Sequence, residues 1–220
     1  VSLDGNYLYM AYWGYTDEIV KIDLSDNSVV WTYTGFVDPM YASAFKLTKD
    51  ENYIFIGGFD DRLFKINTAD GTLEWASSQT VSYVYAVDVG TDLVVAGCYQ
   101  YVRALRISDG SLEWSNYYSG QQFFGVGIDS SEQTVYVSYD AQSIRSLAYS
   151  DGALIDTLGG FTTSADLDAI TMHPTLDNIL AIVDNYNDNI YIYNTTTETI
   201  LNTINNVETG SSGEPPAVFL

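Results

Sequence analysis

Oxygen-bearing side chains crowd the run DNYNDN at residues 184–189, and such a run can bind calcium. A helix–loop–helix calcium loop places oxygen ligands at positions 1, 3 and 5, Gly at position 6 and Glu at position 12. Counted from Asp184, position 3 is Tyr186 and position 6 is Asn189, so the loop pattern fails. Asp184 and Asp188 are therefore weak metal candidates, because a turn between two strands explains the same Asn and Asp residues. We expect no cofactor, and calcium is the ion that the sequence leaves open.

Carboxylate pairs at residues 17–18 and 60–61 could exchange protons with a substrate in general acid–base catalysis. Both pairs fall in segments that we expect to be exposed turns, and nothing in the sequence converges on them. His173 is the only histidine, and the proline after it is typical of a turn. The chain has no Walker A loop, no G-x-S-x-G motif and no Cys-x-x-Cys motif, and Cys98 has no second cysteine with which to form a disulfide. The sequence therefore predicts a protein that is not an enzyme.

The charge of the chain excludes several kinds of partner. There are 8 basic and 29 acidic residues, for a net charge of −21. Nucleic acid and anionic membrane surfaces are both bound through Lys and Arg, so we expect neither as a partner. No apolar run approaches the roughly 18 residues that span a bilayer, which argues against membrane insertion. Solubility and mutual repulsion explain the charge, and binding of divalent cations or of a basic partner is the more specific alternative.

Asn194-Thr195-Thr196 is a glycosylation site if the chain is secreted from a eukaryotic cell. Asn194 aligns with Asn67, where a strand enters an exposed hairpin turn, so a glycan fits there, although such triplets also occur by chance. Few lysines and many Tyr, Thr, Ser and Asn residues agree with this reading. We predict a secreted or extracellular protein.

The chain has 19 tyrosines, and packing on half-buried strand faces explains many of them. Other aromatic residues fall in expected turns and loops, where a rigid ring favours recognition. The interaction candidates are Tyr15, Phe59, Tyr99, Tyr101 and Tyr186. We expect them to contact a partner protein, further copies of the same chain, or a glycan.

One segment recurs along the chain and shows which elements must carry these residues. The copies are LSDNSVVW at 24–31, TADGTLEW at 68–75, ISDGSLEW at 107–114, YSDGALID at 149–156 and NTTTETILN at 194–202. Their spacing is about 43 residues, within the roughly 40 to 50 residues of blade-type propeller repeats. Each Asp-Gly pair indicates a tight hairpin turn, because Gly tolerates the positive φ that such turns need.

Each unit contains four short β-branched and aromatic runs joined by hairpin-length connections. The sequence predicts an all-β protein, a β-propeller of about five four-stranded blades that forms a single domain over residues 1–220. The units fall at approximately 1–40, 41–80, 81–120, 121–163 and 164–210, and residues 211–220 either complete the first blade or start another. Because AVFL at 217–220 matches AFKL at 44–47, we favour a ring closed by pairing of the N- and C-terminal segments over a piece of a longer run of blades.

The recurring segment also carries a resemblance to a known family. KINTADGTLEW at 65–75 and ALRISDGSLEW at 104–114 have Gly and Trp at the separation of the repeat A-x-D-x-x-T-G-x-x-x-W, and KIDLSDNSVVW at 21–31 has Asn27 in place of Gly. The chain resembles the quinoprotein dehydrogenase-like (PQQ-repeat) β-propellers. In that family the Trp docks against the neighbouring blade. The resemblance implies this structural role for Trp31, Trp75 and Trp114.

We do not expect this chain to share the enzymatic activity of that family. Quinone-dependent members are longer and hold their cofactor with calcium and commonly with an adjacent pair of cysteines, whereas this chain has one cysteine. The resemblance therefore implies a non-catalytic member. We predict a non-enzymatic, secreted or extracellular propeller that is a structural or protein-binding module, with self-assembly as one form of that role. The alternatives are a fragment of a quinone-dependent dehydrogenase-type propeller and a calcium-dependent glycan-binding propeller.

Overall fold

The structure is a computed structural model that describes residues 1–12, 18–36, 40–58, 61–77, 82–139, 143–162, 165, 167–173, 175–176, 178–205 and 207. Within these residues every regular element is a strand, and the strands form five antiparallel sheets that follow one another along the chain. We call the sheets blades 1 to 5. Among the same residues, no helix is long and apolar enough to cross a membrane.

The strands have the following bounds. Blade 1 contains β1 (Tyr7–Tyr12), β2 (Glu18–Asp23) and β3 (Val29–Tyr33). Blade 2 contains β4 (Met40–Leu47), β5 (Tyr53–Gly58), β6 (Leu63–Asn67) and β7 (Leu73–Ala76). Blade 3 contains β8 (Val84–Val89), β9 (Leu93–Arg106) and β10 (Leu112–Gln122). Blade 4 contains β11 (Gly125–Ile128), β12 (Thr134–Ser138), β13 (Ile144–Ala148) and β14 (Leu154–Leu158). Blade 5 contains β15 (Leu167–Met172), β16 (Ile179–Asp184), β17 (Asn189–Asn194) and β18 (Thr199–Asn205).

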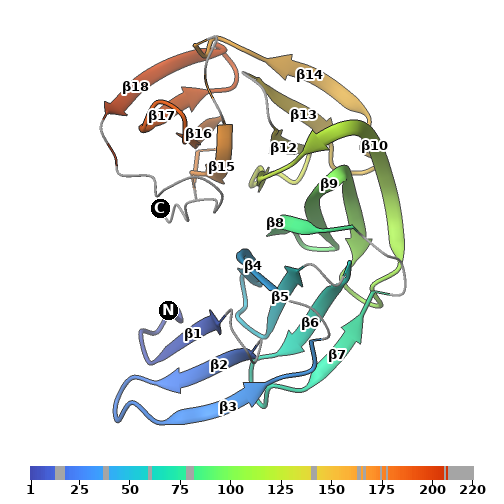
Figure 1. Ribbon diagram of the computed structural model, residues 1–220, viewed down its shortest axis with the longest axis vertical. Helices are drawn as coiled ribbons and strands as arrows, with labels where there is room; N and C mark the ends of the chain where they lie inside the picture. Colours follow the sequence, from blue (N-terminus) through green and yellow to red (C-terminus); the bar gives the residue numbers. More distant parts are fainter. Residues whose placement is uncertain are drawn as a thin grey trace.

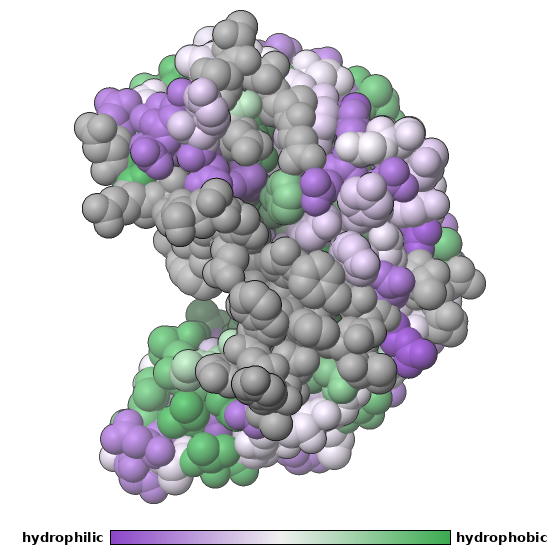
Figure 2. Space-filling model, viewed as in Figure 1, coloured by the Kyte–Doolittle hydropathy of each residue, from purple (hydrophilic) through white to green (hydrophobic). Residues whose placement is uncertain are grey.

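The five blades are arranged in an arc around a centre (Figure 1). Strands β4, β8, β11 and β15 lie innermost and contact one another in that order, while β3, β7, β10, β14 and β18 lie on the outside. This confirms the prediction of a β-propeller of about five blades. Blades 1 and 5 face each other across an opening in the arc (Figure 2). The predicted closing segment, residues 211–220, lies outside the described residues.

The hydrophobic core is divided into four layers, one between each pair of successive blades. The layer between blades 1 and 2 contains Tyr9, Trp31 and Phe64, and that between blades 2 and 3 contains Phe55 and Leu105. Equivalent layers join blade 3 to blade 4 and blade 4 to blade 5. Because an inner strand is covered on both faces, strands such as β5 are buried along almost their whole length. Burial falls towards the outside: every residue of β8 is buried, whereas the first four residues of β14 are exposed.

Blade 3 differs from the expected pattern of separate strands. The sequence predicted four separate strands in each unit, whereas blade 3 has one continuous element, β9, that reverses direction at Gln100 with φ of +64°. The backbone N–H of Ile107 donates to the carbonyl O of Asp92 at 2.8 Å, which brings the two halves of β9 side by side. The halves therefore correspond to the two middle strands of the other blades. No glycine marks this turn, which is why its tightness was not expected.

The turn before each outer strand has the same conformation in all five blades. One residue in each has a positive φ of 53° to 74°, and these residues are Asn27, Gly71, Gly110, Gly152 and Glu198. In the turns that contain aspartate, a carboxylate oxygen accepts the backbone N–H two residues later, for example from Thr72 to Asp70 at 3.0 Å. Only three of these five turns have glycine at the residue with positive φ. The conformational freedom of glycine therefore does not by itself explain in which turns it occurs.

Candidate interaction surface

Four tyrosines lie as two pairs of neighbouring rings at the end of blade 3 where β9 reverses. We call Tyr83, Tyr99, Tyr101 and Tyr117 the tyrosine cluster. The ring centroids of Tyr101 and Tyr117 are 5.1 Å apart, and those of Tyr83 and Tyr99 are 6.4 Å apart. Tyr117 exposes 58% of its surface, and Tyr83 and Tyr99 are also exposed. Exposed aromatic rings with polar tips are the residue type that dominates protein recognition surfaces.

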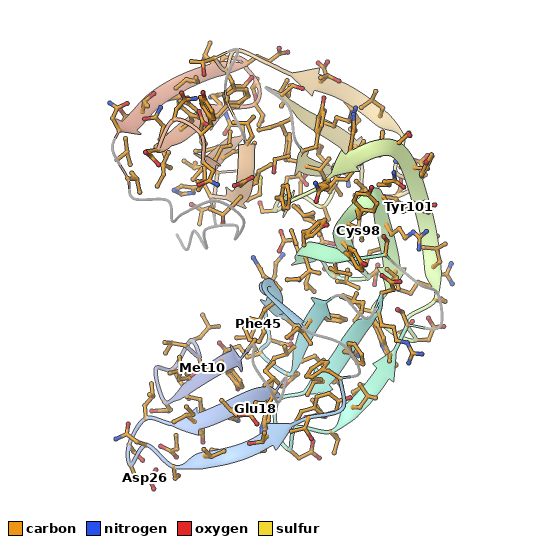
Figure 3. The ribbon with its side chains drawn as sticks, in the orientation of Figure 1. Met10, Glu18, Asp26, Phe45, Cys98 and Tyr101 are labelled. Carbon is orange, nitrogen blue, oxygen red and sulfur yellow. The ribbon has the colours of Figure 1, made fainter. Side chains whose placement is uncertain are left out.

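Two long strands place this cluster. Tyr101 on β9 and Tyr117 on β10 are opposite each other in the strand register. Strand β10 has 11 residues, more than any other outer strand within the described chain, and it carries Tyr117 towards the end of the blade opposite the Asp-Gly turn. Arg103 follows Tyr101 by two residues and lies on the same face, with its guanidinium carbon 4.0 Å from the Tyr101 ring. Figure 3 labels Tyr101 on this strand.

The predicted interaction residues are distributed over several blades. The structure places Tyr99 and Tyr101 on either side of the reversal at Gln100, each beside a different tyrosine ring. It places Tyr186 in the turn between β16 and β17, on blade 5, with 70% of its surface exposed. Tyr15 and Phe59 lie outside the described residues. Sequence reasoning did not select Arg103, although its spacing of two residues from Tyr101 on a predicted strand was the available signal.

The three repeated tryptophans contact the next blade in the same way. Each indole N–H donates to a backbone carbonyl at the start of the following blade's turn: Trp31 to Thr68 at 2.9 Å, Trp75 to Ile107 at 3.0 Å and Trp114 to Tyr149 at 2.8 Å. The indoles are buried or half-buried, so each contact combines apolar packing with a satisfied N–H group. That these tryptophan contacts stabilise the arrangement of the blades stays a prediction.

Glycine occurs in those turns that receive an indole. A Cβ atom would lie 2.8 Å from Trp31 at Gly71, 2.7 Å from Trp75 at Gly110 and 2.6 Å from Trp114 at Gly152. Such separations are shorter than van der Waals contact allows. Blade 4 has Asp156 at the tryptophan position, and the turn of blade 5 has Glu198 in place of glycine. Blade 5 likewise has Asn202, and the turn of blade 1 has Asn27.

Two lysines share the carbonyl groups that accept the indoles. The ammonium of Lys21 donates to the carbonyl O of Thr68 at 3.0 Å, and that of Lys65 donates to the carbonyl O of Ile107 at 3.2 Å. Each ammonium also lies over a tyrosine ring, at 4.0 Å in blade 1 and 3.7 Å in blade 2. Burial lowers the pKa of Lys65. These cations are engaged between blades and do not form a basic surface.

The run DNYNDN forms the turn between β16 and β17. The buried carboxylate of Asp184 accepts hydrogen bonds from the side-chain amide of Asn187 at 2.7 Å and from the hydroxyl of Tyr191 at 2.8 Å. Asp188 is exposed and has a φ of +52°. Among the described residues, no group of three or more His, Cys, Asp or Glu side chains is arranged to hold a metal ion. Both of these contacts to Asp184 are made within the β16–β17 hairpin.

Asn194 begins the corresponding turn after β17. Its side-chain oxygen accepts the backbone N–H groups of Thr196 at 2.9 Å and Thr197 at 3.0 Å. This is the same side-chain-to-backbone contact that Asn67 makes with Ala69. The side chain is half-buried, and whether it carries a glycan stays a prediction.

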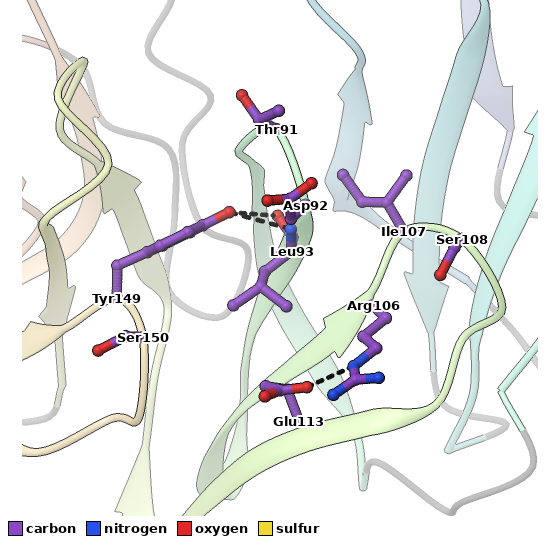
Figure 4. A pocket seen from close by; sticks show the side chains of 9 residues that line it. All are labelled: Thr91, Asp92, Leu93, Arg106, Ile107, Ser108, Glu113, Tyr149 and Ser150. Carbon is purple, nitrogen blue, oxygen red and sulfur yellow. Dashed lines mark hydrogen bonds and ion pairs between the residues drawn. The ribbon is translucent and has the colours of Figure 1, made fainter.

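A pocket of about 590 Å³ opens between blades 3 and 4 at their Asp-Gly turns (Figure 4). Of its three charged residues, Arg106 and Glu113 form an ion pair with each other, and Asp92 is the third. The backbone N–H of Leu93 donates to the Tyr149 hydroxyl at 2.9 Å. The Arg106–Glu113 pair and the Tyr149 hydroxyl are therefore engaged within the protein, and neither contact indicates a reaction.

Cys98 does not suit the cofactor site of the quinone-dependent relatives. The side chain is fully buried in the core layer between blades 2 and 3, and burial raises the pKa of its thiol to about 12. The chain has no other cysteine. A buried, protonated and solitary thiol cannot supply the adjacent cysteine pair that commonly holds the quinone in that family.

The comparisons with known proteins identify one family. The model of a PQQ-like repeat family, described as outer membrane protein assembly factor BamB, matches residues 1–123 and again residues 47–218. The two matches overlap, as expected when one repeat fits the chain in more than one position. No curated protein sequence matches the chain.

Proposed function

Because this chain belongs to the PQQ-like repeat family described by the assembly factor BamB, we propose that it is a non-enzymatic β-propeller that binds another protein. The family description names an outer membrane protein assembly factor, which supports a role in contacts between proteins. The tyrosine cluster is the observation that carries the proposal. It combines exposed aromatic surface with an arginine stacked on one ring, and Tyr and Arg are the side chains that contribute most to protein interfaces.

The rest of the chain supports a scaffold for that surface. The tryptophans and two lysines are engaged between blades, and they hold the strands whose ends present the tyrosines. We further propose that the protein is secreted or extracellular, which the composition and the Asn194 triplet support. A net charge of −21 opposes contact between copies at low salt, so we place a partner protein before self-assembly.

Site-specific photo-cross-linking tests the proposal. A benzophenone amino acid is introduced at Tyr117 of the full chain, and the protein is irradiated in an extract of the organism that makes it. The matched control carries the same cross-linker at Leu154, which exposes the same 58% of its surface but lies on blade 4. We expect a discrete cross-linked product from position 117 that is weak or absent from position 154. The substitution Tyr99→Ser should reduce the yield at position 117, because it removes part of the same surface.

Two results would count against the proposal. Equal products from positions 117 and 154 would mean that the cluster has no preference for a partner. A single product with the mass of two copies of the chain would replace the partner protein with self-assembly, which light scattering at high protein concentration would then measure.

A further inference from the structure

Arg145 lies between two tyrosine rings at the junction of blades 3 and 4. Its guanidinium carbon is 4.3 Å from the centroid of Tyr118 and 4.1 Å from that of Tyr139. Phe123 continues the group, with its ring 5.2 Å from Tyr118 and 5.9 Å from Tyr139. The arginine comes from β13 of blade 4 and Tyr118 from β10 of blade 3, so the arrangement depends on both blades.

One edge of this guanidinium is engaged by the protein. Nη1 donates to the side-chain carbonyl oxygen of Gln121. Across the described part of the chain, no group accepts a hydrogen bond from Nε or Nη2 of Arg145. An arginine presents its N–H groups in a rigid planar fork that matches the two oxygens of a carboxylate. The two rings and Gln121 therefore fix the plane of the Arg145 guanidinium, and its edge formed by Nε and Nη2 is available to a ligand.

The electrostatic setting of Arg145 is unusual in so acidic a chain. The ion pairs within the described residues join Lys46 to Asp88, Lys49 to Glu132 and Arg106 to Glu113. Arg145 has aromatic rings and an amide as neighbours and no carboxylate among the described residues, although the chain has 29 acidic residues. The side chain is only half-buried, so a ligand can reach it. Aromatic surroundings also weaken the screening of its charge by water.

We propose that Arg145 is a carboxylate-binding site, which takes an Asp or Glu side chain or a C-terminal carboxylate of the partner protein. The site adjoins the tyrosine cluster along β10, because Tyr117 and Tyr118 are consecutive residues of that strand, although their side chains point to opposite faces of the blade. This inference rests on the proposed function, since it names the chemistry of the partner that the tyrosine cluster contacts. An arginine held flat by two rings loses little side-chain freedom when it binds, which favours this use of the residue.

Nuclear magnetic resonance of the arginine Nε–Hε group tests the site directly. The Arg145 signal is assigned with the variant Arg145→Lys, and wild-type protein is titrated with the capped peptide Glu-Glu-Glu and, separately, with Gln-Gln-Gln. We expect a saturable shift with the glutamate peptide, with a Kd of about 1 mM for one exposed bidentate contact. The glutamine peptide should leave the signal unmoved. Inorganic phosphate serves as a third titrant, and tighter binding of phosphate than of the glutamate peptide would contradict the carboxylate assignment.

The variants separate binding from folding. Arg145→Lys should weaken binding of the glutamate peptide at least about tenfold, because a single ammonium cannot form the fork. Arg106→Lys is the matched control: that arginine is paired with Glu113, and its substitution should leave the affinity unchanged. Gln121→Ala keeps the open edge of the fork and should retain binding within about threefold, a loss below the roughly 1.4 kcal/mol that a tenfold change represents.

The inference is overturned if millimolar glutamate peptide leaves the Arg145 signal unmoved or if Arg145→Lys binds as well as wild type. These results are distinguishable from failure of the proposed function. A partner cross-linked at position 117, together with an Arg145 signal that does not move on titration, would refute the carboxylate site alone. Binding of the glutamate peptide at Arg145 without a preferred cross-link at position 117 would refute only the proposal that the tyrosine cluster binds a partner.

Discussion

Gly71 lies so close to Trp31 that a Cβ atom on the glycine would sit 2.8 Å from the indole of the preceding blade. The same relation recurs at Gly110 and Gly152, and it is absent where the preceding blade has no tryptophan. Asn27 and Glu198 adopt the same positive φ without glycine. The turn glycine and the tryptophan are therefore two halves of one contact between blades.

The substitution Gly110→Ala should destabilise the protein by about 2 to 4 kcal/mol, which combines strain at positive φ with overpacking against Trp75. Asn27→Ala is the control, because it introduces Ala at a similar φ of +61° in a turn that none of the three described tryptophans contacts. It should cost only about 1 kcal/mol. Urea unfolding of both variants checks the difference, and equal losses would show that the indole does not select glycine.

Trp114→Phe should be more destabilising than Trp75→Phe by about 1 kcal/mol. In the second variant the carbonyl O of Ile107 keeps the ammonium of Lys65 as a donor, whereas the carbonyl O of Tyr149 loses the indole N–H that it accepts. Ala104 stands opposite Trp114 where blade 2 has Lys65 opposite Trp75. Urea midpoints measure the comparison. Adding Lys65→Met to Trp75→Phe should remove the difference, and a difference that persists would refute the shared carbonyl as its cause.

Cys98 should be inert to thiol reagents in the native protein. Its pKa is raised to about 12 by burial, while the unfolded thiol titrates near 9.0, so only the unfolded chain forms a thiolate between these values. The free energy of unfolding should therefore fall as the pH rises above 9.0, and the variant Cys98→Ala should lose this dependence. Labelling with a chromogenic disulfide at pH 8 checks the reactivity. Labelling of native protein as fast as of urea-unfolded protein would contradict complete burial.

Asp70 should titrate below its usual pKa of 3.8, chiefly because the Thr72 hydroxyl donates to its carboxylate at 2.7 Å. The contribution of this contact is present above pH 3.8 and is lost as the pH falls through the lower pKa of the folded state. Carboxyl-carbon NMR titration measures that pKa. Thr72→Val should raise it towards 3.8 and leave the pKa of Asp109, which is lowered by the equivalent contact with Ser111, unchanged. An Asp70 pKa that does not respond to this substitution would assign the shift to another cause.

The repeat made much of the fold predictable. The spacing of the Asp-Gly turns and tryptophans indicated five blades, and the structure packs them closely at Gly57 and Gly97. A Cβ atom would lie 2.5 Å from the Val84 side chain at Gly57 and 2.6 Å from the carbonyl O of Phe123 at Gly97. These features are local or periodic, so the sequence displays them directly.

The candidate surface was predictable only in part. Tyr99 and Tyr101 could be selected as aromatic residues near an expected turn, but the pairing of Tyr101 with Tyr117 depends on the register of β9 and β10. Arg145 could not be selected at all, because Tyr118 and Tyr139 approach it from two blades. Contacts between residues so far apart along the chain are set by the tertiary structure, and no local pattern reports them.

The division of the core into layers between blades also affects how such a protein can evolve. Each layer is filled by two neighbouring blades, so the energetics approach those of a linear array with nearest-neighbour coupling. Duplication or loss of one whole blade would leave the remaining layers filled. To form the contact between blades, a duplicated blade that keeps its tryptophan requires only that the following blade has a glycine in the turn before its outer strand. The number of blades is therefore an evolvable quantity in this architecture, and surfaces such as those around Tyr117 and Arg145 can diverge without repacking the rest of the molecule.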